Sequence, residues 1–516
     1  MSPADLFPFL LPLSLVCAGG LVCLGLEAFL PRAAKHRLLP WLAALAVVGA
    51  AVAQAFSAGD GHLHGMLAMD GARAWLCVAI LAATAISLGG LQQSLTRDDY
   101  PGGEPYALTL FAAAGTMLMV MSNDAIALFM GLELASLSVY ALVGLRRHRL
   151  DANEALFKYF AMGAVFSAIF LYGIALTYGA TGFTAFGHAP LAGREGLHIL
   201  GQSLMVIGLL FKVGAVPFHF WSPDAYTGAP VAVTGFMGAV IKVGGFAALG
   251  ALWLNLIAIT GGATIDSPIA LDATLILPAA ALEAPHLHKF HLVFLVSAVL
   301  SLLLGNFSAL RQTSARRMIA FSSVAHAGYM LLAFALPSAA ADGSGTIQLA
   351  SLWYYLVAYA ITTAGALTAL AALSGREDAT DDLAGLSGRG RAKPLHGAVL
   401  TVFMASFAGI PPTAGFLGKY LVLSDLVAKE QIWLAIIAML VAVVGAAYYL
   451  RLVITVWSAP SGDHADEIAE PTPGLSAWGL SVAALAVVAL IVAPSWMGPA
   501  KAVAATATTT AAAIQP

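Results

Sequence analysis

The chain has 516 residues, of which 60% are hydrophobic and only 10% charged, and its formal net charge is −3. Soluble domains carry about 25% charged residues, so this composition excludes a soluble enzyme. The deficit extends along the whole chain, which also excludes a soluble domain with a single anchor, and no basic tract suits nucleic acid. We therefore expect an all-α polytopic membrane protein.

Apolar runs of about 20 residues, each long enough to cross a bilayer, recur from end to end. They predict about 14 transmembrane helices, of which the seventh and twelfth are long and interrupted by proline. The N-terminus carries Asp5 and no positive region, so we expect a retained first helix and not a signal peptide. The expected spans are 6–30, 38–58, 71–93, 105–121, 124–145, 152–179, 198–226, 230–255, 290–308, 313–336, 346–373, 394–428, 431–457 and 474–494.

The basic residues support this map, because cytoplasmic loops are enriched in lysine and arginine. With both termini outside, fifteen of the 24 basic residues lie at inner loops and helix ends and five on the outer side. The other four are all lysines within spans: Lys158, Lys212, Lys242 and Lys419.

The spans predict five parts of the chain. They are three N-terminal helices (1–104), a first five-helix unit (105–255), an outer loop (256–289), a second five-helix unit (290–457), and a last helix with a tail (458–516). The outer loop carries His286 and His288, with His291 just past its end, and we favour a solvated loop over a metal site. The linker 374–393 is charged and expected to be cytoplasmic, and the tail 502–516 is expected to fray. Three cysteines, without metal-ligand spacing, are expected to be inert: Cys17, Cys23 and Cys77.

Ionisable groups inside the spans are the candidate functional residues. A charge at the bilayer centre costs roughly 3 kcal/mol, and such groups usually mark an ion path. Glu133 lies about nine residues, or about 13 Å, into the fifth helix. Lys158, in the sixth, either pairs with Glu133 or extends its amine to the inner interface. The structural alternative for Glu133 is a carboxyl that ties two helices together.

Lys212 and Lys242 are the deepest of these lysines. A buried lysine can exchange its proton near neutral pH, which suits a relay. His326, in the tenth span, also titrates near neutral pH, and Ser322 and Ser323 lie one turn away to hold a water or a tautomer. A core histidine with satisfied hydrogen bonds is the alternative for His326.

Two spans are broken close to a lysine. Pro217 follows Lys212, while Pro411 and Pro412 precede Lys419. Proline removes a backbone donor, and the freed polar groups need protein or water around them. Broken helices at corresponding positions of two halves predict inverted repeats with the binding groups beside the breaks. Asp224, after the first break, is expected to cap the returning half-helix.

A weak internal match supports the repeat. The run Glu133–Ser136 followed by Tyr140 is similar to Ser322–Ala325 followed by Tyr329, with the same spacing to the tyrosine. Ser322 stands here where the first half has Glu133, so the second half lacks the acid.

Four stretches taken together resemble the antiporter-like membrane subunits of respiratory complex I, most closely the subunit N group of bacterial NADH–quinone oxidoreductase. They are GLELASLSVYALVG, LLFKVGAVPFHFWSPDAYTGAPVAVTGFMGAVIKVGGF, QTSARRMIAFSSVAHAGYMLLAF and AGIPPTAGFLGKYLVL. The resemblance covers nearly the whole chain and implies fourteen helices with two inverted five-helix repeats. Lysine at 419 argues against the M-like subunit, and the short end after helix 14 argues against the L-like one. The loop 256–289 is longer than the family leads us to expect.

The resemblance implies a proton path through matching residues: Glu133, Lys158, Lys212, Lys242, His326 and Lys419. It implies a proton-pumping module in the bacterial inner membrane, surrounded by lipid and by other membrane and peripheral subunits. Those subunits would hold FMN, iron–sulfur clusters and quinone, and this chain no cofactor or metal. Quinone reduction would alter the contact of Glu133 with Lys158 or Lys212 and drive protons outward through Lys419. An Mrp-type or stand-alone cation/proton antiporter subunit is the alternative, and a structural scaffold is a third.

Overall fold

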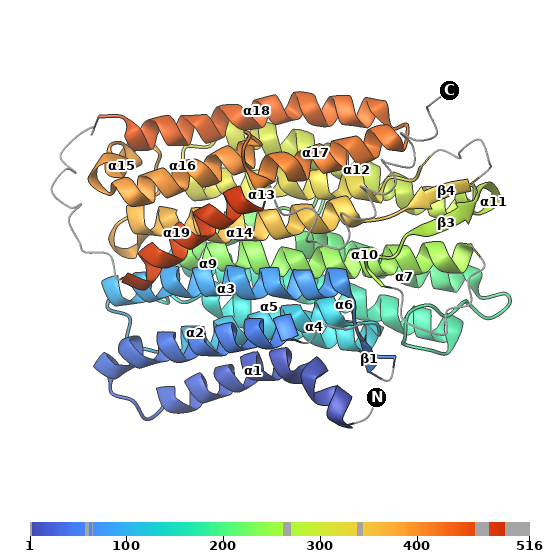
Figure 1. Cartoon of the computed structure of the whole chain (residues 1–516), viewed down its shortest axis with the longest axis horizontal. Coiled ribbons are helices and arrows are strands. Elements are labelled where there is room, and N and C mark those ends of the chain that lie inside the picture. The colour runs from blue at the N-terminus through green and yellow to red at the C-terminus, as the bar shows by residue number, and fades with distance from the viewer. Residues whose placement is uncertain are drawn as a thin grey trace.

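The computed structural model describes residues 3–56, 61–63, 65–261, 270–337, 344–459 and 474–490. Long helices run side by side along one direction and form a bundle (Figure 1). They are α1 (Pro3–Glu27), α2 (Arg32–Phe56), α3 (Gly71–Arg97), α4 (Glu104–Met121), α5 (Ala125–Val143), α6 (Leu150–Thr181), α7 (Glu195–Val213), α9 (Val231–Phe236) continued by the π-turn η1 (Met237–Ile241) and α10 (Lys242–Thr260), α12 (Pro285–Leu310), α13 (Ala315–Leu331), α14 (Ala350–Leu373), α16 (Pro394–Ala408), α17 (Ala414–Ala428), α18 (Ile432–Trp457) and α19 (Gly474–Ala489).

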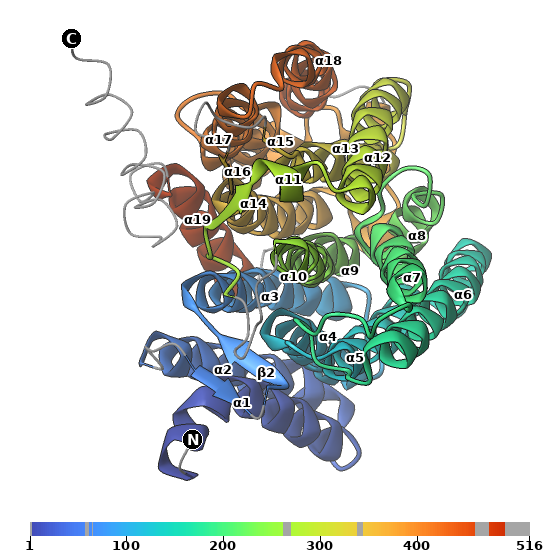
Figure 2. The same ribbon diagram turned by 90° about the vertical axis from the view of Figure 1, so that its right-hand side faces the viewer.

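Short elements connect these helices. The helical ones are α8 (Ser222–Gly228), α11 (Ala279–Leu282), η2 (Leu332–Phe334), η3 (Arg376–Asp378), η4 (Ala384–Leu386) and α15 (Arg389–Ala392). The strands are β1 (Gly61–Leu63), β2 (Leu67–Met69), β3 (Leu275–Pro278) and β4 (Ser344–Ile347). Viewed along the bundle, α10 and α14 lie near the middle, whereas α1, α6 and α18 lie at the periphery (Figure 2). The central position of α10 and α14 agrees with their almost complete burial.

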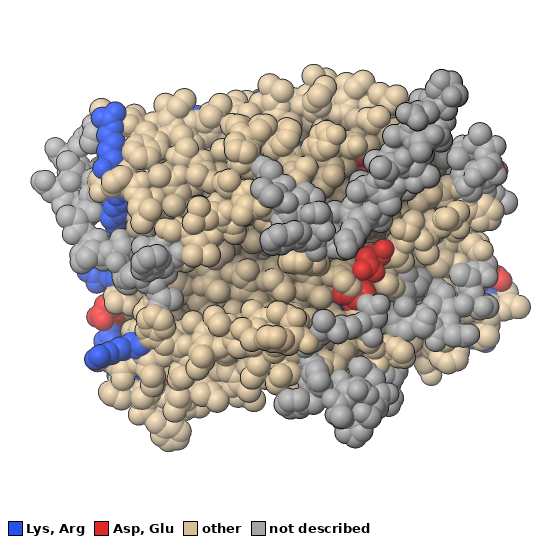
Figure 3. All heavy atoms as spheres, viewed as in Figure 1, with Lys and Arg blue, Asp and Glu red and all other residues tan. Residues whose placement is uncertain are grey.

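Twelve helices in the described part of the chain are long and apolar enough to cross a membrane. The shorter α16, α17 and α19 occupy the places of the twelfth and fourteenth expected spans. On the face seen in Figure 3, lysine and arginine gather along one edge, at the helix ends, and most of the surface beside them is uncharged. The predicted all-α polytopic membrane fold is therefore confirmed.

Both predicted breaks are present, and the half-helices before them end in the same way. α7 stops at Gly214 (φ +70°) and α16 at Gly409 (φ +81°), left-handed conformations that a residue with a Cβ adopts only with strain. Pro217 and Pro412 follow, each preceded by a cis peptide bond. The hydrogen bonds that close the two ends run from Ala215 N–H to the Leu210 carbonyl and from Ile410 N–H to the Ala405 carbonyl.

Serines of α12 satisfy the backbone at the first break. The Val216 N–H donates to Ser301 Oγ (2.9 Å), and the Ser297 hydroxyl donates to the Val216 carbonyl (2.5 Å). A polar backbone group without a partner is costly at membrane depth, so these two contacts explain how the chain can be unwound there. At the second break Thr413 caps α17 by accepting from the Phe416 N–H.

The outer loop expected over 256–289 is shorter than predicted and partly structured. α10 continues to Thr260 and α12 begins at Pro285, since proline at the first helical position costs no hydrogen bond. Between them β3 pairs antiparallel with β4, which no sequence pattern predicted. Leu271 fixes the loop: its N–H donates to Asp70 (3.1 Å) and its carbonyl accepts from the Trp353 indole (2.7 Å). Residues 262–269 of this loop and the tail 502–516 lie outside the described residues.

Candidate functional site

Three of the four lysines predicted within spans are buried in the bundle. Their exposed fractions are 3% for Lys212, 5% for Lys242 and 7% for Lys419. Each amine contacts neutral oxygen atoms, and within the described chain none of the three lies within ion-pair distance of a carboxylate. A charged group without a paired anion is costly inside a membrane bundle, so these three lysines are the candidate ionisable groups of the site.

Lys212 lies in the last turn of α7, directly before the break. Its Nζ donates to Ser136 Oγ of α5 (2.5 Å) and lies 5.8 Å from the centroid of the Tyr140 ring. Glu133 is one turn before Ser136 and near enough to act electrostatically on Lys212, and its buried Oε1 has no hydrogen-bond partner among the described residues. The C-terminal end of a helix favours a cation, so α7 itself stabilises the charged form of Lys212.

The structure corrects the expected pairing of Lys158 with Glu133. The Lys158 amine lies 2.6 Å from Glu154 and 3.0 Å from Asp224, and its side chain is 42% exposed. Asp224 also pairs with Arg317 (3.1 Å). Asp224 therefore connects α6, α8 and α13 and does not serve mainly as a helix cap. Glu154 lies one turn before Lys158 on the same helix, whereas Asp224 is distant in the sequence, so the pattern of α5 and α6 alone did not reveal it.

Lys242 follows the π-turn η1, an insertion that often marks a functional position in a helix. Its Nζ donates to the backbone carbonyl of Ser323 in α13 and lies 5.4 Å from the Tyr359 ring centroid. Gly245, one turn further on, packs against the side chains of Lys212 and Val213. The C-terminal end of α7 and the start of α10 are therefore in contact, which places Lys212 and Lys242 on adjoining turns.

His326 is held by two tyrosines. Its Nδ1 lies 2.8 Å from the Tyr355 hydroxyl and its Nε2 lies 3.0 Å from the Tyr449 hydroxyl. Ser322 contacts the same Tyr449 hydroxyl. Ser322 therefore reaches the histidine through a tyrosine.

Ser323 gathers two more tyrosines. Its Oγ lies 3.1 Å from the Tyr226 hydroxyl and accepts from the Tyr359 hydroxyl (3.0 Å). Ser323 thus joins Lys242, through its carbonyl, to hydroxyl groups on α8 and α14. The sequence analysis missed all these tyrosines, although a tyrosine deep in a span must find a partner for its hydroxyl, and that signal was available.

Lys419, on α17, caps the half-helix across the second break. Its Nζ donates to the carbonyls of Phe407 (2.7 Å) and Ala408 (3.1 Å) at the end of α16, and it lies 5.1 Å from the Tyr329 ring centroid. A cation at these carbonyls is favoured by the helix dipole. Both breaks therefore place a lysine at the C-terminal end of a half-helix, one from within the helix and one from across the gap.

A small cavity connects the histidine to the second break. It has room for about one water molecule, and its walls include His326, Tyr355, Ser406 and Gly418. His326 is also within electrostatic reach of Lys242 and Lys419. These side chains form separate hydrogen-bonded groups around Lys212, Lys242 and His326, with Lys419 beside the cavity. We call them together the central polar line: Lys212, Lys242, His326, Lys419, Ser136, Ser322, Ser323, Tyr226, Tyr355, Tyr359 and Tyr449.

Replacing Gly409 by alanine should disturb Lys419 as well as the backbone. Left-handed residues with a Cβ cost about 1–2 kcal/mol, and the new Cβ would lie 3.0 Å from Lys419 Cδ. Gly214→Ala is the matched control, because its Cβ would meet only a Trp221 ring carbon at 3.7 Å. We expect similar losses of thermal stability in the two variants and the larger loss of proton pumping in Gly409→Ala. Equal pumping in both would show that Lys419 tolerates displacement.

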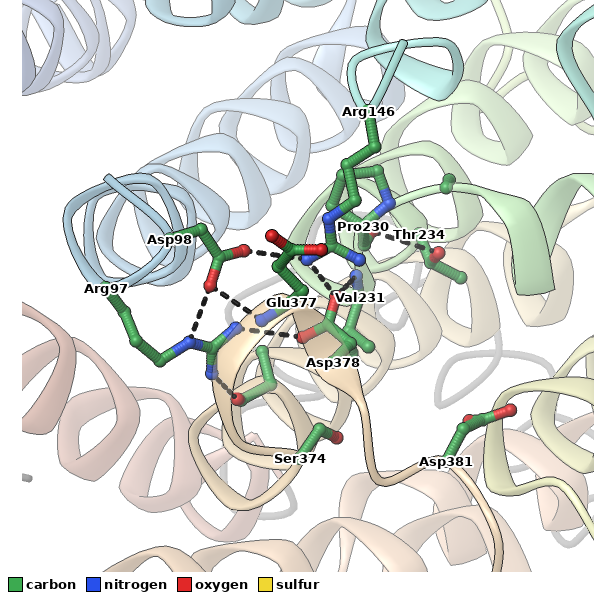
Figure 4. Close-up of polar contacts among 12 residues, drawn as sticks. Arg97, Asp98, Arg146, Pro230, Val231, Thr234, Ser374, Glu377, Asp378 and Asp381 are labelled. Atoms are coloured by element: carbon green, nitrogen blue, oxygen red, sulfur yellow. Dashed lines mark hydrogen bonds and ion pairs between the residues drawn. The ribbon is translucent and has the colours of Figure 1, made fainter. Parts of the chain in front are cut away.

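A second charged cluster closes the end of the bundle from which helix α9 starts (Figure 4). Asp378, in the linker predicted to be cytoplasmic, has a fully buried carboxylate that pairs with Arg97 (3.1 Å) and Arg146 (2.8 Å). It also accepts from the Val231 N–H at the start of α9 (2.9 Å). Asp98 bridges the same two arginines at 3.0 and 2.8 Å. The linker thus anchors the helix that carries Lys242.

The stability of this cluster should depend on pH. Burial by itself would raise the pKa of the Asp378 carboxyl, but the charges of Arg146, Arg97 and Arg316 outweigh it and hold that pKa below its ordinary value. A lowered carboxyl pKa adds stability above the unfolded pKa of about 3.9, and this stability is lost as the pH falls through the folded pKa. We therefore expect the difference in unfolding temperature between the native chain and Asp378→Asn to hold from about pH 8 to about pH 5 and to shrink below about pH 4. A difference that shrinks already near neutral pH would contradict this assignment.

Two further polar contacts lie away from the central polar line. Asp425 pairs with Lys429 at 2.9 Å on α17, and Lys429 also donates to the Ala333 carbonyl (3.2 Å). His286 Nε2 contacts Thr260 Oγ1 (2.7 Å). In the described ranges no three His, Cys, Asp or Glu side chains come close enough to hold a metal ion.

Comparison with known proteins places the chain in a family. The sequence matches the family described as NADH:quinone oxidoreductase/Mrp antiporter, TM, over residues 122–261 and 259–445. NADH-quinone oxidoreductase subunit N 1 of Solibacter usitatus is 32% identical over 505 residues, which cover 96% of each chain. NADH-quinone oxidoreductase subunit N of Trichlorobacter lovleyi is 34% identical over 455 residues, 87% of this chain and 86% of that one.

Solved structures agree with this match. A chain of respiratory complex I from Thermus thermophilus has a TM-score of 0.74 and 30% identity, and the similarity covers 94% of this chain and 97% of that one. A chain of the Mrp complex from Dietzia sp. DQ12-45-1b has a TM-score of 0.75 at 20% identity, over 95% and 97% of the two chains, which shows a likeness of fold alone. The resemblance seen in the sequence is confirmed: this chain belongs to the family of membrane subunits shared by NADH:quinone oxidoreductases and Mrp antiporters.

Proposed function

We propose that this chain is the N-type, proton-translocating membrane subunit of an NADH–quinone oxidoreductase. Relatives that carry this name align with it over most of their length and of this chain. The Mrp-type alternative is not favoured, because the Mrp neighbour shares the fold at much lower identity. Electron transfer, with its FMN, iron–sulfur clusters and quinone, would then belong to other subunits of the assembly.

One observation carries the proton-translocating role. The amines of Lys212, Lys242 and Lys419 are buried, and among the described residues they contact neutral oxygens and aromatic rings but no carboxylate. A lysine held by a carboxylate stays charged, whereas a lysine without an anion can gain and lose its proton. The hydroxyl groups of the central polar line can each donate and accept a proton, and water would bridge the intervals between the amines.

The direction of transfer is part of this proposal. Glu133 and Lys212 would form the controlled pair, and Lys158, which is held by Glu154 and Asp224, would lie at the inner side of this pair. Protons would pass from Lys212 to Lys242 and His326 and leave from Lys419 to the outer side. Two of the basic residues assigned to inner loops, Arg97 and Arg146, meet at one end of the bundle, where both pair with Asp378. This supports a bacterial inner membrane orientation with both termini outside.

We also propose that 105–255 and 290–457 are inverted repeats. The matching ends of α7 and α16 support this, and so do two close helix contacts. Gly115 meets the backbone of Gly131 and Ala135, as Gly305 meets that of Phe321 and Ala325. This alignment is shifted by one residue from the match found in the sequence, so that Glu133 corresponds to Ser323.

Proton uptake by inverted membrane vesicles tests the function. With Lys212→Met we expect NADH-driven uptake to fall at least about tenfold, because a general acid–base group is lost. The complex should still assemble and still pass electrons from NADH to ferricyanide. Lys158→Met should cost less, since that amine is exposed and has two anionic partners.

The same preparation separates the alternatives. Co-purification with NADH dehydrogenase subunits would support the redox assembly. Co-purification with a sodium–proton exchange complex that lacks NADH dehydrogenase activity would support the Mrp-type alternative instead. Normal uptake with Lys212→Met, Lys242→Met and Lys419→Met would favour a structural scaffold.

A further inference from the structure

A buried polar cluster in the first five-helix unit has no part in the central polar line. His198 and Gln202 lie on α7 and Asn255 on α10, with exposed fractions of 5%, 8% and 6%. Thr177 of α6 lies beside them. The cluster lies toward the end of the bundle where α7 begins, which is the opposite end of α7 from Lys212.

Several atoms of this cluster lack a hydrogen-bond partner within the described chain. They are both ring nitrogens of His198, Asn255 Oδ1 and Thr177 Oγ1. The side chains border a cavity with room for one or two water molecules, and the connection between α6 and α7, including Phe183 and His188, covers it. Buried polar groups are almost always satisfied, so the cavity and the orphaned atoms together indicate bound water.

The cluster shares one face of α7 with Lys212. Residues 198, 202, 205, 209 and 212 are spaced three or four apart and therefore lie in one row along the helix. The row is polar at both ends and apolar between them, where Met205 and Leu209 are fully buried. Phe170 of α6 faces this interval, since a Cβ on Gly208 would meet it at 2.8 Å.

We propose that His198, Gln202, Asn255 and Thr177 bind water and form the outward end of a second proton outlet, which the apolar plug of Met205, Leu209 and Phe170 keeps shut. Wetting of the plug would let the Lys212 ammonium give its proton to this water and become a neutral amine. Apolar constrictions close water paths in this way in channels. The proposal rests on the orientation and the role of Lys212 given above. It adds that the first unit is closed to the outside by three side chains.

Substituted cysteines test the water site in the assembled complex. The native Cys17, Cys23 and Cys77 are first replaced by alanine, and silver ion is then added to one side of the membrane at a time. Ala192→Cys, in the exposed connection before α7, reports which side this end of the helix faces. We expect His198→Cys and Asn255→Cys to react from that same side, and Leu209→Cys to react at least about tenfold more slowly. Cysteines at 198 and 255 that are as unreactive as the one at 209 would overturn the water site.

A polar substitution within the apolar plug tests whether the plug keeps the outlet shut. Leu209→Asn should make the membrane leak protons without NADH, measured as faster decay of an imposed pH difference, and Leu209→Met should stay tight. Adding His198→Leu to Leu209→Asn should restore tightness. A tight Leu209→Asn variant, or a leak that His198→Leu leaves unchanged, would overturn the outlet. Because this leak needs no electron transfer, the result is independent of whether the chain belongs to a redox assembly.

Discussion

Replacing Lys242 by methionine is expected to reduce NADH-driven proton pumping by about a hundredfold, as loss of a general acid–base group does. Lys242 is the one amine that contacts both α13, through the Ser323 carbonyl, and the Tyr359 ring. Methionine keeps an unbranched, flexible side chain, so packing in the almost fully buried α10 should survive. The central polar line would then be cut between Lys212 and His326.

The measurement is proton uptake and quinone reduction in the same vesicles. Quinone reduction should fall together with pumping if the two are coupled, while NADH oxidation by ferricyanide should remain. Lys289→Met is the matched control, because it is the same substitution at an exposed lysine. Undiminished pumping with Lys242→Met would remove this residue from the path.

The Asp378→Asn substitution should have the largest effect on stability, a loss of about 3 kcal/mol. It leaves the buried guanidinium groups of Arg97 and Arg146 short of one anion and weakens the start of α9. We expect a lower unfolding temperature and less assembled complex. Glu377→Gln is the control: its carboxylate is 41% exposed and faces only His148 at 3.3 Å, so its loss should cost less than about 1 kcal/mol. Equal stability of the two variants would show that the Asp378 cluster is not the anchor inferred here.

Much of the fold follows from two physical rules that a sequence exposes. A helix that crosses a bilayer needs a long apolar run, and such runs predicted the helices. A charge inside the bilayer is costly, and this cost identified Lys212, Lys242 and Lys419 as candidates. The breaks followed from Pro217 and Pro412, because proline cannot continue a helix. None of these inferences needs knowledge of which helices touch.

The partners of these groups could not be predicted, because they depend on helix packing. Lys158 finds Asp224 through the return of α8, and His326 finds Tyr449 only because α18 packs against α13. Asp378 lies in the linker that was predicted to be charged and cytoplasmic, and nothing in its sequence indicates that it is buried. Its burial depends on Arg97 and Arg146, which come from distant parts of the chain.

Ordered water in a high-resolution density map of the assembled complex tests the central claim most directly. The account predicts water that bridges the amines of Lys212 and Lys242, and a further molecule in the cavity beside His326 and Gly418 that leads to Lys419. Dry apolar packing across either interval, at a resolution that shows water elsewhere in the same subunit, would contradict it.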